Sequence, residues 1–256
     1  MYSEEQLDRL EQEEHELTEE ALAAMLLVLT NAKLDLENEL HAFYRKYGKD
    51  GVITLAEARK WVSKKDHRRR IVLLWLLTHK IFDKAAKEIR PLFRRLLEDV
   101  SQKELEFFKT KLSDKDIGKI IDKQWGDDNL NWLDRLDNDF ELWESRLNKQ
   151  LKTDFVHAES EEDVLDNLYL FFDKIERVLE KLVYTESTAD GSRIRNEIFD
   201  LMGVKKYIFY SRVDERRCEY CGALHGKTFL TTEFEVGVTA SPIHPRCRCW
   251  EVPIID

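Results

Sequence analysis

The shortage of helix-breaking residues over most of the chain is the feature that most constrains its fold. Residues 1–202 contain a single proline, Pro91, and only five glycines. Glycine and proline are the least favourable residues inside a helix, so a stretch this long with so few of them favours long helices. Three of the four prolines lie in the last fifteen residues. The sequence therefore predicts a helical body and a different structure near its C-terminal end.

Short motifs predict where individual helices begin and end. The glycines within residues 48–51 are expected to end a long first helix, and Thr54 with Glu57 forms a capping box for a short second one. Ser160 opens a later helix in the same way. Pro91 is expected to disturb the helix around it, because proline removes a backbone hydrogen bond and its ring crowds the preceding turn.

From residue 206 the pattern changes to that of short strands. The segments 206–213, 227–234 and 249–255 are rich in β-branched and aromatic residues or alternate in polarity. We therefore expect two domains, a helical body over residues 1–205 and a small β-rich module over residues 206–256. The predicted fold is mainly α, with an elongated body, and α+β overall.

All four cysteines of the chain lie in this module, as Cys218, Cys221, Cys247 and Cys249. A module of this size buries little apolar surface, so an additional link usually stabilises it. The acidic N-terminal segment is unlike a secretory signal, and we expect a soluble protein made in a reducing cytoplasm. There, clustered cysteines are more often metal ligands than disulfides. We therefore predict that zinc binds the cluster.

Cys218 and Cys221 have the C-x2-C spacing of a zinc knuckle, but the second half of the site has two solutions. Cys247 with Cys249 would complete a site of four thiolates. His244 with Cys247 would give three thiolates and one imidazole. Reduced buried thiols and a disulfide are the competing interpretations. We expect a structural zinc ion, because no suitable general base accompanies the cluster as a catalytic site would require.

Charge is strongly segregated along the chain, although its net value is −10. Residues 59–95 hold thirteen Lys or Arg against three acids, a local excess that favours contact with phosphates. The alternative is that these bases pair with the acidic first helix. No apolar run is long enough to span a bilayer, so we expect no membrane partner. The candidate DNA-contact residues are Lys64, Lys65, Arg68, Arg69, Arg70, Arg94 and Arg95.

The pattern of the C-terminal module also carries a family resemblance. It resembles the signature of the Mu F-like minor head proteins, a family of phage head morphogenesis, and the Thr-Glu pair upstream resembles an element that precedes the signature. The segment 47–62 is similar to minor head proteins of phages that infect Gram-positive bacteria. Beside the cysteines and His244, the motif residues are Thr185, Glu186, Asp214, Leu224, Gly226, Phe229, Pro242, Pro245 and Arg248.

The resemblance implies a minor head protein of a tailed phage that is present in few copies and associated with the portal vertex. It would act in head assembly and in DNA packaging or ejection. Its expected partners are the portal protein, other head proteins and, without sequence preference, packaged phage DNA. The expected location is the virion, after assembly in the host cytoplasm. No small-molecule substrate is expected.

Two other function classes compete with this interpretation. One is a zinc-ribbon-like nucleic-acid-binding protein outside the virion, which the six bases and seven acids from residue 211 onward do not favour. The other is an enzyme such as a transferase that uses Glu186, Ser187 and Arg193. We interpret these three residues as a solvated helix end and predict that the protein is not an enzyme.

Overall fold

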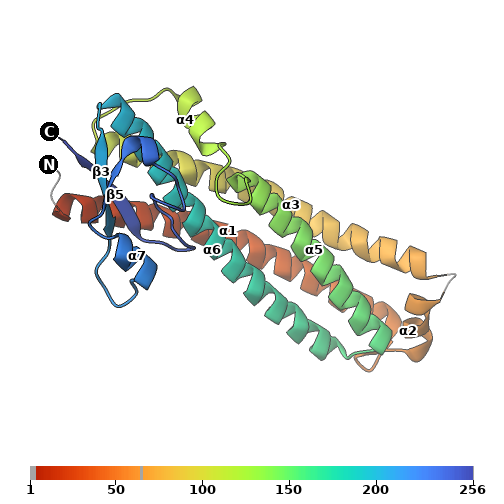
Figure 1. Ribbon diagram of the computed structural model, residues 1–256. Helices are drawn as coiled ribbons and strands as arrows, with labels where there is room; N and C mark the ends of the chain where they lie inside the picture. Colours follow the sequence, from red (N-terminus) through yellow and green to blue (C-terminus); the bar gives the residue numbers. More distant parts are fainter. Residues whose placement is uncertain (1–3, 64–65, 256) are drawn as a thin grey trace. The chain divides into compact units, whose positions relative to one another are not determined.

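The computed structural model describes residues 4–63 and 66–255 (Figure 1). The predicted fold class is confirmed, because long helices are followed by a small C-terminal sheet. The main elements, in chain order, are α1 (Glu4–Tyr47), β1 (Gly48–Lys49), β2 (Val52–Ile53), α2 (Leu55–Val62), α3 (His67–Phe107), α4 (Asp114–Ile121), α5 (Trp132–His157), α6 (Glu161–Leu201), β3 (Lys206–Ser211), α7 (Glu219–Leu224), β4 (Thr228–Leu230) and β5 (Cys249–Ile254).

The chain forms two compact units, and each long helix contributes to both. The predicted boundary at residue 206 falls inside the first unit, so the division into a body and a module stays a prediction. The first unit consists of Met1–Ala23, Leu92–Arg135 and Glu180–Asp256, and the second of Ala24–Pro91 and Leu136–Leu179.

The predicted helix ends are confirmed where a capping group was recognised. A Cβ atom on Gly48 would lie 2.7 Å from the carbonyl oxygen of Tyr44, so the close approach that ends α1 requires glycine. Thr54 caps α2 by accepting a hydrogen bond from the backbone N–H of Glu57 at 3.3 Å. Ser160 caps α6 in the same way, through the backbone N–H of residue 163 at 3.1 Å.

The expected interruption at Pro91 is wrong, because α3 continues through this residue as one helix. Pro91 is exposed, so its ring projects towards solvent. Ile89, two residues earlier, is fully buried and holds its turn of the helix by packing. The packing of the helix outweighs the local preference of one proline.

The second unit is a helical core to which four helices contribute apolar side chains. The rings of Phe82 on α3 and Phe172 on α6 are stacked with centroids 6.4 Å apart, and Phe140 on α5 lies edge-on to Phe82. Leu36 on α1 is also buried. A hydrogen bond also links α3 to α5 in this unit, donated by the hydroxyl of Thr78 to the side-chain oxygen of Asn148 at 3.0 Å.

The sheet of the first unit has three antiparallel strands in the order β4-β3-β5. Tyr207 and Phe209 on β3 are fully buried, and the ring of Tyr207 lies 6.3 Å from that of Phe199 on α6. The sheet and the C-terminal half of α6 therefore share one apolar core. Ser211 at the end of β3 pairs with Cys249 at the start of β5, which places the cysteine at the edge of this core.

Candidate metal centre

The first two cysteines lie on a tight turn at the start of α7. Cys218 is the N-cap residue of α7, and its Sγ accepts a hydrogen bond from the backbone N–H of Cys221 at 3.3 Å. After the helix, Gly226 has a φ of 76° and its N–H donates to the carbonyl oxygen of Phe209 at 2.8 Å. Glycine adopts this φ at little cost. The motif glycine thus returns the chain from the turn to the sheet.

The other two cysteines come from the loop before β5 and from the strand itself. The backbone N–H of Cys247 donates to the carbonyl oxygen of His244 at 3.1 Å, which closes a turn at the second half of the motif. Cys249 then begins β5. Cys221, Cys247 and Cys249 are all buried, in a cluster with Phe209.

The donor atoms lie close enough together to hold one metal ion. The sulfur atoms of Cys221, Cys247 and Cys249 are within 4.8 Å of one another, and so are the donors of Cys218, Cys221 and His244. The Sγ atoms of Cys221 and Cys247 are 3.8 Å apart. Two thiolates on a tetrahedral zinc ion, each at the usual Zn–S length, are also about 3.8 Å apart. The residues present therefore fit the metal that the sequence predicts.

Both candidates for the fourth ligand, His244 and Cys249, have their donor atom at the cluster. The Nδ1 atom of His244 is 2.9 Å from the carbonyl oxygen of Pro245. If Nδ1 carries the proton and donates to that oxygen, Nε2 has a free lone pair for a metal. Cys249 offers its sulfur from the buried side. His225, by contrast, uses its Nδ1 to accept the backbone N–H of Ser211 at 3.2 Å, which gives it a role in the fold.

Hydrogen bonds between the thiols separate their pKa values. Hydrogen bonds from the thiols of Cys221 and Cys249 lower the pKa of Cys247, and the same bonds raise the pKa of each donor. Burial opposes ionisation of Cys218, but the hydrogen bonds from the backbone N–H and the thiol of Cys221, together with the nearby His244, outweigh burial and lower the pKa of Cys218. A bound cation would favour the thiolate form of every ligand.

A bidentate ion pair joins the two halves of the motif. The guanidinium of Arg248 donates to the carboxylate of Asp214 through both terminal nitrogens, at 2.7 and 2.8 Å. The hydrogen bond from Arg248 lowers the pKa of Asp214 to about 2. Because Asp214 precedes the first cysteine pair and Arg248 lies between the last two, the pair links both segments of the site.

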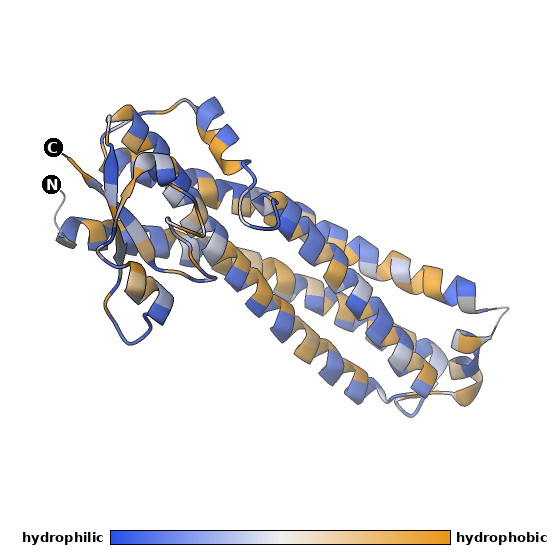
Figure 2. Cartoon of the chain, viewed as in Figure 1, coloured by the Kyte–Doolittle hydropathy of each residue, from blue (hydrophilic) through white to orange (hydrophobic). Residues whose placement is uncertain are grey.

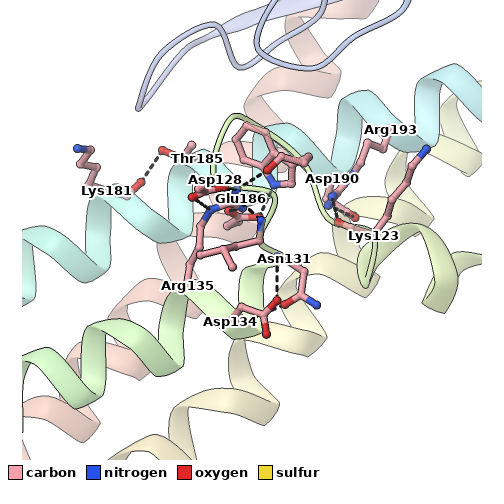
Figure 3. Close-up of polar contacts among 12 residues, drawn as sticks. Lys123, Asp128, Asn131, Asp134, Arg135, Lys181, Thr185, Glu186, Asp190 and Arg193 are labelled. Atoms are coloured by element: carbon pink, nitrogen blue, oxygen red, sulfur yellow. Dashed lines mark hydrogen bonds and ion pairs between the residues drawn. The ribbon is translucent and has the colours of Figure 1, made fainter.

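The upstream Thr-Glu pair lies on α6, where it contacts two different partners. The hydroxyl of Thr185 accepts the backbone N–H of Arg246 at 3.4 Å, so α6 supports the cysteine loop directly. The carboxylate of Glu186 is fully buried and accepts hydrogen bonds from Trp125 at 2.9 Å and from Arg135 at 2.6 Å (Figure 3). Burial raises the pKa of Glu186, while Arg135 acts in the opposite direction.

A second buried network joins α6 to the last strand, and the sequence did not indicate it. The guanidinium of Arg195 donates to Glu104 on α3 and to Glu251 on β5, each at 2.7 Å. Glu251 also accepts the backbone N–H of Ser241 at 2.6 Å. Thr188, Ser192 and Arg195 recur along α6 at spacings of four and three, and this polar stripe is the signal that could have revealed the network.

The interpretation of Glu186, Ser187 and Arg193 as a solvated helix end is wrong. All three side chains are buried, with exposed fractions of 0%, 6% and 7%, and α6 continues to Leu201. Arg193 donates to the carbonyl oxygen of Lys123 at 2.8 Å (Figure 3). These residues hold the first unit together through ion pairs and hydrogen bonds to its other segments.

The candidate DNA-contact residues divide into exposed and paired groups. Arg68 and Arg69 are exposed, and neither forms an ion pair with any residue that the structure describes. Lys64 and Lys65 lie outside the described residues. The partners of the others lie on α2, on α3 itself and at the end of α4: Arg70 pairs with Glu57, Arg94 with Glu98 and Asp122, and Arg95 with Asp99.

The cysteine cluster and its supporting contacts lie within one contiguous stretch that matches a known family. Residues 174–252 match the model of the family described as phage Mu protein F like protein. The match includes all four cysteines, the Thr-Glu pair and the Asp214–Arg248 ion pair. No curated protein and no solved structure matches the chain. The resemblance predicted from the motif is confirmed.

The Mu F-like family suggests a phage head morphogenesis protein with a structural role. Such a protein would associate with other head proteins and be part of the virion. Over the part of the chain that the structure describes, no helix is both long enough and apolar enough to cross a membrane.

Proposed function

We propose that the protein is a minor head protein of a tailed phage, bound near the portal vertex, and that it acts in head assembly and in DNA packaging or ejection. The observation that carries this proposal is the Mu F-like match over residues 174–252. The motif residues Asp214, Gly226 and Arg248 all serve to build the fold around the cysteines. A non-enzymatic role in assembly explains why the signature consists of such residues.

We also propose that a structural zinc ion holds the C-terminal module. Cys218, Cys221 and Cys247 would be three of its ligands, and Cys249 or His244 the fourth. The proposal is supported by the 3.8 Å separation of two sulfur atoms and by the knuckle hydrogen bond at Cys218. In this account residues 206–256 are a module that the metal and α6 stabilise together.

Contact with packaged DNA is a narrower part of the proposal. Arg68 and Arg69 are the described members of the candidate set that make no ion pair with other described residues, so they are the ones available for phosphates. Replacing both with alanine should weaken non-specific DNA binding and flatten its dependence on salt. Filter binding across a salt series measures this, and unchanged binding would remove the DNA contact.

The test of the main proposal is the fate of the full chain during phage assembly. We expect the chain in purified heads and in complex with the portal protein after the heads are dissociated. A variant with Cys218→Ser and Cys221→Ser should fail to incorporate, whereas Tyr220→Phe, at the exposed position between them, should incorporate normally. A chain that is absent from heads and binds nucleic acid in the host instead would favour the zinc-ribbon alternative.

A further inference from the structure

The first half of α3 exposes a large apolar face. The run IVLLWLL at residues 71–77 places apolar side chains on every side of the helix, while the core covers one side only. A helix that is apolar all round is normally covered all round. The hydrophobic bands of this half of α3 are visible in Figure 2. The exposed side chains are Val72 at 47%, Leu73 at 51%, Trp75 at 46% and Leu76 at 50%.

Positive charges bracket this apolar face along the helix. Arg69, Leu73, Leu76 and Lys80 follow one another at spacings of four, three and four, so they form one row. A parallel row with the same spacings consists of Arg68, Val72, Trp75 and His79, and the ring of His79 contacts Glu144 on α5 at 3.0 Å. Among the described residues, no ion pair involves Arg68, Arg69 or Lys80. We call these two rows the basic face.

The first half of α6 carries a face of opposite charge. Glu162, Asp166, Tyr169 and Asp173 recur at the same spacings of four, three and four, and Leu170 beside them is 57% exposed. The three acids are exposed and form no ion pair with the residues that the structure describes. We call these five residues the acidic face. It offers apolar surface with negative charge on both sides.

Within the second unit, the helices that carry the two faces start at the same end of the helical core. The two faces point in opposite directions. Arg70 near the start of α3 pairs with Glu57 on α2, and the N–H of Glu161 at the start of α6 donates to Gly51, just before α2, at 2.8 Å. The stacked rings of Phe82 and Phe172 lie fifteen residues after the start of α3 and eleven residues after the start of α6. The two helices therefore run in the same direction. The buried and exposed rows lie on opposite sides of each helix.

We propose that copies of this chain associate head to tail, with the basic face of one copy on the acidic face of the next. In a parallel register the matched spacings would set Arg69 opposite Glu162 and Lys80 opposite Asp173. Leu76 would face Tyr169 and Leu73 would face Asp166, so the charges match more fully than the apolar residues do. A symmetric contact between two basic faces would instead set Arg69 against Lys80 or against its own counterpart, which is repulsive. A head-to-tail contact leaves one free face at each end, so it forms a ring if the rotation closes.

This inference goes beyond the proposed function and does not depend on it. The test uses two variants of the full chain and measures molar mass by analytical ultracentrifugation over a range of concentrations. The first variant carries Leu73→Asp with Leu76→Asp, and the second carries Asp166→Lys with Asp173→Lys. The control is Leu27→Asp, which replaces a leucine on α1 that is 61% exposed and belongs to neither face.

We expect the wild type and the control to form oligomers larger than dimers as concentration rises. Each face variant alone should stay monomeric, with association weakened about tenfold or more. An equimolar mixture of the two variants should form dimers and nothing larger, because it retains one intact basic face and one intact acidic face. That dimer would also show that both variants are folded.

The inference is overturned if the wild type stays monomeric, if neither variant changes association, or if the mixture does not dimerise. It is overturned equally if the basic-face variant loses binding to DNA, to anionic vesicles or to another head protein while self-association is unchanged.

Discussion

Glu186 shows how one buried carboxylate can explain a sequence motif. Its carboxylate accepts hydrogen bonds from Trp125 and Arg135, and the guanidinium of Arg135 also lies over the Trp125 ring, 4.5 Å from its centre. Two segments of the first unit, Leu92–Arg135 and Glu180–Asp256, therefore meet at this side chain. Thr185, its neighbour, supports the cysteine loop instead. The Thr-Glu pair of the motif thus acts in the fold and needs no catalytic explanation.

Replacing Glu186 with alanine should destabilise the first unit strongly. The change leaves the half-buried Arg135 without its buried partner and removes the acceptor of Trp125, and breaking such a pair typically costs about 3–5 kcal/mol. The matched control is Glu197→Ala on the exposed side of α6, which should change the free energy of unfolding by less than about 0.5 kcal/mol. Urea unfolding measures both. Equal effects would contradict the role of Glu186.

Asp190 predicts a pH dependence that can be isolated by mutation. It is fully buried, and burial raises its pKa from 3.8 to about 6 despite Arg193 and Ser101. The folded state therefore holds the proton more tightly, and this stabilisation is lost as pH rises from about 4 to about 6. Relative to Asp190→Asn, the wild type should lose about 2 kcal/mol of unfolding free energy over that range.

The comparison is made by denaturant unfolding at a series of pH values. Asp200→Asn, at an exposed position on the same helix, is the control and should show no such trend relative to the wild type. A difference between the wild type and Asp190→Asn that does not change between pH 4 and pH 6 would show that Asp190 is not held in the protonated form.

At the level of the helix, α6 contains a glycine, Gly191, although glycine has a low helix propensity. A Cβ atom on Gly191 would lie 3.3 Å from Arg195 Nη2 and 3.3 Å from Glu104 Oε1. These atoms belong to the buried ion pair between α6 and α3, which has little freedom to move. The glycine therefore makes room for the pair, at a cost to helix propensity of about 1 kcal/mol.

Gly191→Ala should therefore destabilise the protein by about 1–3 kcal/mol, although alanine is the better helix former. Gly118→Ala on α4 is the matched control, because the nearest atom to its Cβ would be the end of the long side chain of Arg94, at 3.2 Å. That variant should be neutral or more stable. Thermal unfolding distinguishes the two, and a stabilising effect of Gly191→Ala would contradict the packing argument.

The elements that the sequence predicted well are those with local signals. Thr54 and Ser160 cap helices through hydrogen bonds to residues three positions away, and the β-rich segments from residue 206 form β3, β4 and β5. The burial of Glu186 and Arg193 was missed because their partners lie far away in sequence. Ionisable residues are buried only when such partners exist, and a local pattern does not reveal them.

The candidate site was predictable to a similar degree. The C-x2-C turn is local, so its geometry at Cys218 and Cys221 followed from spacing. The second half depends on how β5 pairs with β3, which places Cys249 beside Ser211, and on the turn that carries His244. Spacing alone therefore left two ligand sets open, and the structure keeps both donors at the cluster.

For the whole molecule, the metal should stabilise one unit and leave the other unaffected. All candidate ligands belong to the first unit. Removing the metal with a chelator should therefore raise amide hydrogen exchange in β3, β4 and β5, whereas the segments of the second unit should stay protected. Exchange measured by mass spectrometry tests this. Uniform loss of protection over both units would contradict a metal with a local role.

The most direct test of the account is the metal content of the full chain, purified without added metal and measured by plasma mass spectrometry. The account predicts one zinc ion per chain, and its loss in the variant with Cys218→Ser and Cys221→Ser. A well-folded wild type that contains no zinc would contradict the central claim, and the cysteines would then be a cluster of buried thiols.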